Sequence, residues 1–164
     1  MTTSKSIAIL ALFSTIAVCF GCGGSAIKSA NAKPGANSAN ENSNAAKTNV
    51  EELGILINVP YETEDVVWKE NTARKKLVAV LRFSPADSAK LVAEAEKTRA
   101  PEAATLSSET WFPAELIAQS EMSGNDELKG QSYAADQFFL APYTSGRIVR
   151  IEGTDYFVIE LSAK

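Results

Sequence analysis

The chain after residue 50 alternates apolar and polar residues in patterns that predict strands and helices. The segment 76–83 is the plainest strand, because apolar residues fall on both of its faces. A strand of this kind is typical of a sheet that is covered on both sides. A second apolar run, 65–69, precedes it across a polar loop at 70–75. We therefore expect the two runs to form an antiparallel hairpin.

The clearest helix start in the chain follows this hairpin. Ser84 stands at the N-cap position, Pro85 at N1 and Asp87 at N3. A serine cap, a proline whose missing N–H costs nothing, and an acid near the positive end of the helix dipole all favour a helix here. The helix is expected to run to about Thr98. Its predicted inner face is made of Ala89, Val92 and Ala93. Ala86, Leu91 and Ala95 are expected to flank this face.

Two shorter helices are predicted on weaker signals. Apolar residues at helical spacing across 50–57 predict a helix that is capped by Thr48 and ends before Pro60. Pro113 at N1 with Glu115 at N3 predicts the other. The turn-rich segments 99–110 and 123–130 are expected to be loops, and the periodicity of 133–140 leaves strand and helix both open.

The segments 147–151 and 156–161 predict a closing hairpin. A two-residue loop at 153–154 would mix apolar and polar residues on each face. A loop with an odd number of residues places the apolar residues together, namely Val149, Ile151, Phe157, Ile159 and Leu161. It then leaves the polar set in solvent, namely Arg150, Glu152, Tyr156 and Glu160. We expect the odd loop.

Together these elements predict a single α+β domain over 50–164. Its expected core is a small antiparallel sheet of four or five strands, with two or three helices mainly on one face. No internal repeat is visible in the sequence.

The beginning of the chain has a different pattern. Lys5 is followed by a run of fourteen uncharged residues, 7–20, and then by Gly21, Cys22 and two further glycines. As a helix the run would be about 21 Å long, which is short of the ~30 Å hydrocarbon core of a bilayer. A basic start, a short apolar run and small residues are typical of a secretory signal peptide.

Glycine directly before Cys22, after such a run, resembles the lipobox of bacterial lipoproteins. The resemblance implies that 1–21 is removed and that Cys22 is acylated and becomes the mature N-terminus. The domain would then be extracytoplasmic and held at the membrane by lipid, since two or more acyl chains anchor a protein stably. Ordinary cleavage after the 30–32 triplet is the alternative, and it would give a soluble secreted protein.

The segment 22–49 is composed mainly of Ala, Asn, Ser, Gly and Lys, and Ile27 is its one large apolar residue. Such a segment buries too little apolar surface to offset the entropy of ordering it, so the composition predicts a disordered tether. A coil of this length spans about 30 Å.

Composition removes several classes of function. The chain has no histidine, which argues against Ser-His and Cys-His catalysis and most zinc sites. After processing, Cys22 would be the last cysteine, so disulfides and thiol chemistry are not expected in the domain. From Glu51 onward twelve basic residues stand against nineteen acidic ones, a net charge of −7. A domain this acidic is not expected to bind nucleic acid.

We therefore expect a lipid-anchored envelope protein whose domain has a non-catalytic binding or structural role, with an envelope protein as partner. No cofactor and no metal site are expected, because no phosphate-binding loop or ligand cluster is visible. The aromatic residues Trp111, Phe112 and Tyr143 are the candidate binding surface.

The alternative is a hydrolase that works through paired carboxylates, the main acid–base chemistry left without histidine and cysteine. Its candidate acids are Glu62, Glu64 and Asp65, or the adjacent pair Asp126 and Glu127.

Overall fold

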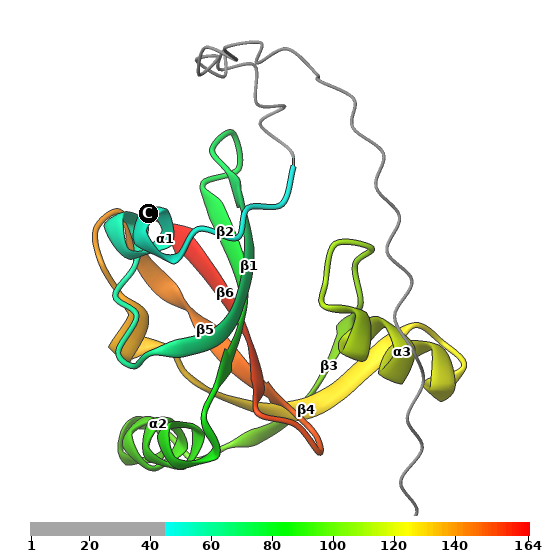
Figure 1. Cartoon of the computed structure of the whole chain (residues 1–164). Coiled ribbons are helices and arrows are strands. Elements are labelled where there is room, and N and C mark those ends of the chain that lie inside the picture. Colours follow the sequence, from blue (N-terminus) through cyan, green and yellow to red (C-terminus); the bar gives the residue numbers. More distant parts are fainter. Residues whose placement is uncertain (1–44) are drawn as a thin grey trace, which may run out of the picture. The chain divides into compact units, whose positions relative to one another are not determined.

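The computed structural model describes residues 45–164, which form one α+β unit (Figure 1). Within this range one antiparallel sheet has six strands, in the order β1-β2-β6-β5-β4-β3. In chain order the elements are α1 (Val50–Leu56), β1 (Thr63–Asn71), β2 (Lys76–Phe83), α2 (Pro85–Thr98), β3 (Glu102–Ser107), α3 (Ala114–Ser123), β4 (Glu127–Ala134), the 3-10 helix η1 (Asp136–Phe138), β5 (Tyr143–Ile151) and β6 (Tyr156–Ala163).

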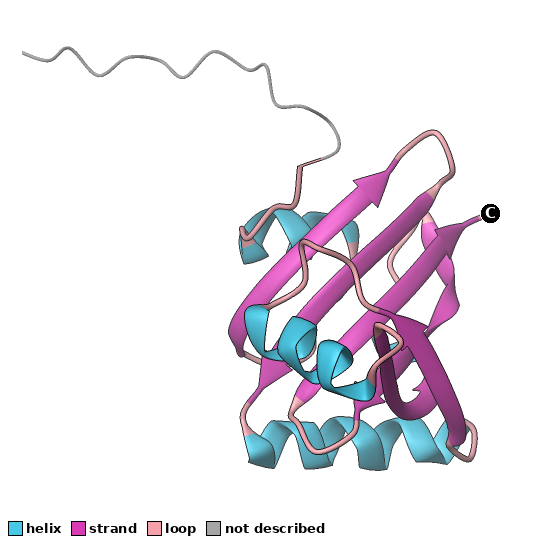
Figure 2. Cartoon of the chain, turned by 90° about the vertical axis from the view of Figure 1, so that its right-hand side faces the viewer, coloured by secondary structure: helices cyan, strands magenta, loops and turns pink. Residues whose placement is uncertain are grey.

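The sheet is covered on both faces, each with its own hydrophobic core. The first core lies under α1 and α2 and contains Leu53, Leu91 and the β2 residues Leu77 and Leu81. The second lies under α3 and holds other residues of the same strands together with Leu116. Figures 1 and 2 show α3 on the opposite side of the sheet from α1 and α2. Two of the helices thus share one face, and the third covers the other.

The predicted strand count was too low, because segments predicted to be loops contain strands. β3 lies wholly within the 99–110 segment and pairs with β4, which itself begins inside the 123–130 segment. β3 is an edge strand, and Leu106 is its one buried residue. A strand with most side chains in solvent shows little apolar alternation, so its sequence reads as a loop.

The predicted odd register of the last hairpin is wrong. Arg150 lies opposite Phe157 and Val149 opposite Val158, the register of the rejected even loop. Both faces of the sheet are buried, so apolar residues are needed on each face. The register was predicted by placing all the apolar residues on one face, and this assumption does not hold for such a sheet. Tyr156, expected in solvent, is buried in the second core.

The first hairpin and the α2 start are confirmed. β1 and β2 pair antiparallel, and both faces of β2 are covered. Ser84 caps α2 by accepting a hydrogen bond from the Asp87 N–H, and the helix ends at Thr98. The inner face of α2 is shifted from the prediction, because its buried residues are Ser88, Leu91 and Ala95, and the last two were expected only at the flank. The face of α2 that packs on the sheet therefore carries the bulky Leu91, and the smaller Ala89, predicted to face the sheet, does not.

The described chain begins before α1 and lies along the edge of the sheet. Lys47 and Trp68 exchange two backbone hydrogen bonds of 2.9 Å. The chain at Lys47 therefore pairs with the outer edge of β1. Asn49, rather than the predicted Thr48, caps α1 by accepting from the Glu52 N–H at 3.0 Å. Cys22, the signal-like run and the tether up to residue 44 lie outside the described residues. None of the helices within 45–164 is long and apolar enough to cross a membrane.

Candidate functional site

Trp111 and Phe112, two of the predicted surface residues, lie just before α3. Their rings pack edge to face with centroids 4.8 Å apart. Phe112 is 6% exposed and belongs to the second core. Trp111 is half-buried, with its indole N–H donating to Glu109 Oε2 and Lys69 Nζ 5.2 Å from its ring centroid.

Tyr143, the third predicted surface residue, lies on the other face of the sheet. It is 2% exposed in the first core, and its hydroxyl donates to Glu70 Oε1 at 2.5 Å. Phe112 and Tyr143 are therefore packing residues on opposite faces, since aromatic rings of this size stabilise a core by burial. The structure does not bring the three together, and of the three only Trp111 keeps a partly open position.

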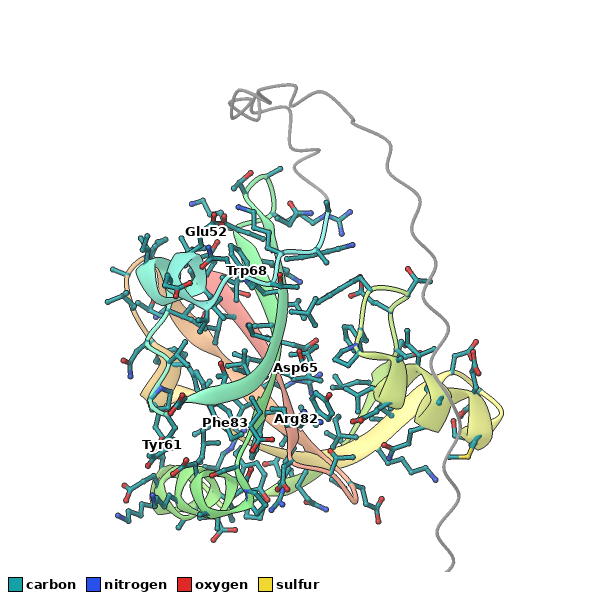
Figure 3. All side chains as sticks on the ribbon, in the orientation of Figure 1. Glu52, Tyr61, Asp65, Trp68, Arg82 and Phe83 are labelled. Carbon is teal, nitrogen blue, oxygen red and sulfur yellow. The ribbon has the colours of Figure 1, made fainter. Side chains whose placement is uncertain are left out.

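Two of the acids considered for catalysis tie strands together. Asp65 Oδ2 accepts a hydrogen bond of 3.0 Å from the Tyr156 hydroxyl. Glu64 Oε2 lies 3.3 Å from Nε of Arg82, whose Nη1 is 3.6 Å from Glu115 on α3. Figure 3 shows Asp65 and Arg82 on the side of the sheet that α3 covers. These contacts explain both acids as links between β1, β2, β6 and α3.

Of the remaining candidate acids, Glu62 and Asp126 are exposed and Glu127 is half-buried. Glu62 is exposed just before β1. Asp126 occupies a turn with φ 54°, and Glu127 accepts a hydrogen bond from the Asn125 side-chain amide at 2.6 Å. Within 45–164 no group of three or more acidic, histidine or cysteine side chains is arranged to hold a metal ion.

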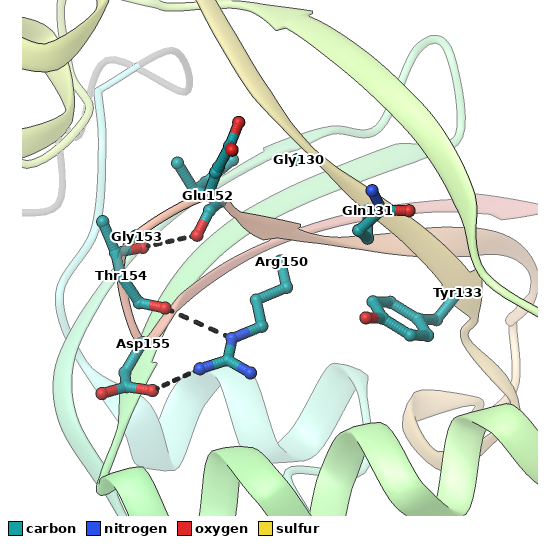
Figure 4. A pocket seen from close by; sticks show the side chains of 9 residues that line it. Gly130, Gln131, Tyr133, Arg150, Glu152, Gly153, Thr154 and Asp155 are labelled. Carbon is teal, nitrogen blue, oxygen red and sulfur yellow. Dashed lines mark hydrogen bonds and ion pairs between the residues drawn. The ribbon is translucent and has the colours of Figure 1, made fainter.

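A polar depression lies at the end of the β4–β5–β6 region, around Arg150 (Figure 4). Its volume is about 460 Å³. It is lined by β4, by the end of β5 and by the β5–β6 turn, namely Gly130, Gln131, Tyr133, Arg150, Ile151, Glu152, Gly153, Thr154 and Asp155. We call it the Arg150 depression.

The β5–β6 turn fixes the guanidinium of Arg150. Gly153 adopts φ 74°, a conformation that favours glycine, and the Thr154 hydroxyl donates to the Ile151 carbonyl at 3.0 Å. The turn so formed offers two acceptors to Arg150. Nε donates to the Thr154 carbonyl at 3.2 Å, and Nη2 donates to Asp155 Oδ1 at 2.9 Å.

Gln131 and Tyr133 complete the depression from β4. Gln131 lies directly opposite Arg150 in the ladder and is exposed, whereas Tyr133 is 5% exposed. Burial, with the nearby Glu96 carboxylate, raises the pKa of the Tyr133 hydroxyl, and Arg150 opposes that rise. The hydroxyl therefore stays protonated at neutral pH. Figure 4 shows the Tyr133 ring across the depression from Arg150.

This arrangement can bind a ligand with both acceptors and donors. A guanidinium has five N–H donors, and the two bonds to the turn leave others directed elsewhere. The Tyr133 hydroxyl and the Gln131 amide add donors, while Asp155 and the Gln131 carbonyl add acceptors. Since Asp155 balances the charge of Arg150, the depression suits a neutral amide group better than an anion.

The sequence pattern did not indicate this site. Arg150 was assigned to the solvent side of a different register, and nothing linked it to Tyr133, seventeen positions earlier. The one signal available was an arginine next to a Gly-Thr-Asp turn, which is common in hairpins.

Trp111 lines a second depression of about 360 Å³. Its other walls come mainly from the end of β1, the β1–β2 turn and the start of β2, including Lys69, Arg74 and Lys76. Charged and apolar groups thus meet beside Trp111.

Comparison with protein-family models, with curated proteins and with solved structures finds no match to this chain.

Proposed function

We propose that the chain is a lipid-anchored protein of a bacterial envelope, acylated at Cys22, whose extracytoplasmic domain binds a partner without catalysing a reaction. The anchor is supported by the sequence around Cys22, which resembles a lipobox and follows a short uncharged run. Acylation at one terminal cysteine would hold the domain at the membrane with no protein segment crossing it.

The observation that carries the binding role is the Arg150 depression. Its arginine is held by the two hydrogen bonds that it donates to the turn, so little side-chain entropy is lost when a ligand binds. Its donors and acceptors match the N–H and C=O groups of an uncharged peptide segment. The proposed ligand is such a segment of another envelope protein.

Photo-crosslinking in intact cells tests the binding role. A photoreactive residue at Glu152, which is exposed and lines the depression, should capture one discrete partner, and Arg150→Gln in the same chain should abolish that capture. Thr105, exposed on the neighbouring edge strand, is the matched control position and should capture nothing. Capture at Glu152 that persists with Arg150→Gln would contradict binding through this depression.

Mass spectrometry of the mature N-terminus tests the anchor. We expect an acylated Cys22, and we expect Cys22→Ser to move the protein from the membrane to the soluble fraction. An N-terminus at any other residue, or a soluble protein with Cys22 intact, would overturn the anchor.

A further inference from the structure

The turn between β1 and β2 carries a concentrated positive charge in an acidic domain. Arg74 and Lys75 lie in the turn, Lys76 follows as the first residue of β2, and all three are exposed. Among residues 45–164 no ion pair involves any of them, whereas other exposed lysines, such as Lys90 and Lys97, are paired with acids. We call these three residues the basic turn.

Local hydrogen bonds fix the backbone of the turn. The Arg74 N–H donates to Asn71 Oδ1 at 2.9 Å, and the Lys75 N–H donates to the Thr72 carbonyl at 3.2 Å. Lys75 has φ 53°, in the left-handed region where glycine or asparagine is favoured. The Lys75 carbonyl accepts a hydrogen bond of 2.9 Å from the Ala163 N–H, so the turn is tied to the end of β6 while the Lys75 side chain stays exposed.

The basic turn lies where the chain enters the domain. Lys47 pairs antiparallel with Trp68, so the residues before Lys47 are directed along β1 toward the β1–β2 turn. Figure 1 shows the first described residues beside the upper end of this hairpin, and Figures 1 and 2 place α2 at the opposite end of the sheet. The point at which the proposed tether joins the domain therefore lies at the same end of the sheet as the basic turn.

Positive charge is concentrated in the basic turn, although Glu70 and Glu109 line the same depression as Arg74 and Lys76. Outside the basic turn, the chain from Glu51 onward carries nine basic and nineteen acidic residues. An anionic surface would attract the turn and repel the remainder, which favours one orientation of the domain. The net charge of the domain alone predicts repulsion from an anionic surface, because it does not take into account where the basic residues lie.

We propose that the basic turn docks on the anionic phospholipid headgroups of the membrane to which the chain is anchored. This inference rests on the proposed anchor, because the anchor attaches at the end of the domain that carries the basic turn. Docking would hold the β1–β2 end against the bilayer and would leave α2 and the Arg150 depression away from the β1–β2 turn and open to a partner.

Vesicle binding of the unacylated chain tests the docking. The protein is residues 22–164 with Cys22→Ser, which keeps both cores because both lie within 45–164. It should sediment with phosphatidylcholine vesicles containing about 30% phosphatidylglycerol and remain free with phosphatidylcholine alone. Binding should weaken as salt is raised, because the contact is between exposed charges.

The variant Arg74→Gln, Lys75→Gly, Lys76→Gln should lower the partition coefficient by about 100-fold, at roughly fivefold per basic residue. Glycine suits the left-handed φ of position 75, so loss of folding does not accompany loss of charge. The control is Lys90→Gln, Lys97→Gln, Arg99→Gln, which removes the same charge at the α2 end and should change binding by no more than about twofold.

Three results would overturn the docking. These are equal binding to neutral vesicles, equal weakening by the two triple variants, and displacement by inorganic phosphate at constant ionic strength, which would indicate a discrete ion site. The tested protein has no acyl chain, so a failure to bind vesicles would not contradict acylation of Cys22. Conversely, finding Cys22 unacylated in cells would not change the vesicle-binding result.

Discussion

The hydroxyl of Tyr156 donates a 3.0 Å hydrogen bond to Asp65 across β2, so it joins β6 to the edge strand β1 over a sequence separation of 91 residues. On the other face of the sheet, Tyr143 makes the equivalent bond to Glu70, near the other end of β1. The two tyrosine–carboxylate bonds fasten the edge strand at both ends, one from each core.

Removing the Tyr156 hydroxyl should loosen β1. We expect Tyr156→Phe to lower the free energy of unfolding by about 1–2 kcal/mol, because a bond to a charged acceptor is lost while the ring remains buried. Urea unfolding measures the change. Tyr61→Phe is the control, since the described residues include no hydrogen-bond partner for the Tyr61 hydroxyl, and it should change stability by less than about 0.5 kcal/mol. Equal effects of the two variants would show that the bond contributes nothing.

The same bonds should make the protein sensitive to alkali. Burial raises the pKa of Tyr143 and Tyr156 well above the ordinary value, and their carboxylate acceptors raise it further. Below pH 10, the tyrosine pKa of the unfolded chain, both states hold the proton and the stabilisation is complete. Above it only the unfolded chain releases protons, so stability is lost as the pH rises toward the folded pKa.

Between pH 10 and 11 the two tyrosines together should remove about 2 kcal/mol from the free energy of unfolding. Guanidinium unfolding at a series of pH values measures this loss. The double variant Tyr143→Phe, Tyr156→Phe should lose correspondingly less stability over the same interval. If wild type and double variant show the same pH dependence, the raised pKa values are not the cause.

Gly130 is required by the close approach of β4 and β5. A Cβ at this position would overlap the carbonyl oxygen of Arg150 and lie 2.9 Å from Val149 Cγ1, so a β5 backbone shift would be needed. We expect Gly130→Ala to cost about 2–3 kcal/mol in thermal or urea unfolding. Gly54→Ala is the contrast, because Gly54 is exposed in α1 with no atom within 4 Å of the new Cβ. It should stabilise by about 0.5–1 kcal/mol. If Gly130→Ala were more stable than Gly54→Ala, the predicted overlap would be contradicted.

The cap of α2 should be measurable on its own. Ser84 accepts from the Asp87 N–H at 3.2 Å and donates to Asp87 Oδ2 at 2.9 Å. Ser84→Ala should lower the free energy of unfolding by about 1 kcal/mol, because an N–H in the first turn loses its acceptor. Ser107→Ala, at an exposed position of β3, should be close to neutral in the same urea experiment. A neutral Ser84→Ala would show that water replaces the cap at no cost.

The residues of the candidate site are brought together by strand pairing that the sequence pattern did not predict. The Arg150 depression depends on the pairing of Arg150 with Gln131 across two strands, one of which begins in a segment predicted to be a loop. Tyr143 was grouped with Trp111 because both are aromatic, and the structure places them on opposite faces. Residue type suggested which side chains matter, but their grouping depends on strand pairing.

The sequence by itself determined the features whose causes lie within a few residues: the α2 start at Ser84, the apolar faces of β2 and the turn that joins β2 to β1. A cap and its acceptor are three positions apart, and strand alternation is visible in a single window. Only the tertiary structure decided that Glu102–Ser107 forms an edge strand and that Arg150 lies opposite Phe157. An edge strand is stabilised mainly by backbone bonds to its neighbour, and a register depends on what covers both faces, so neither is visible within one stretch of sequence.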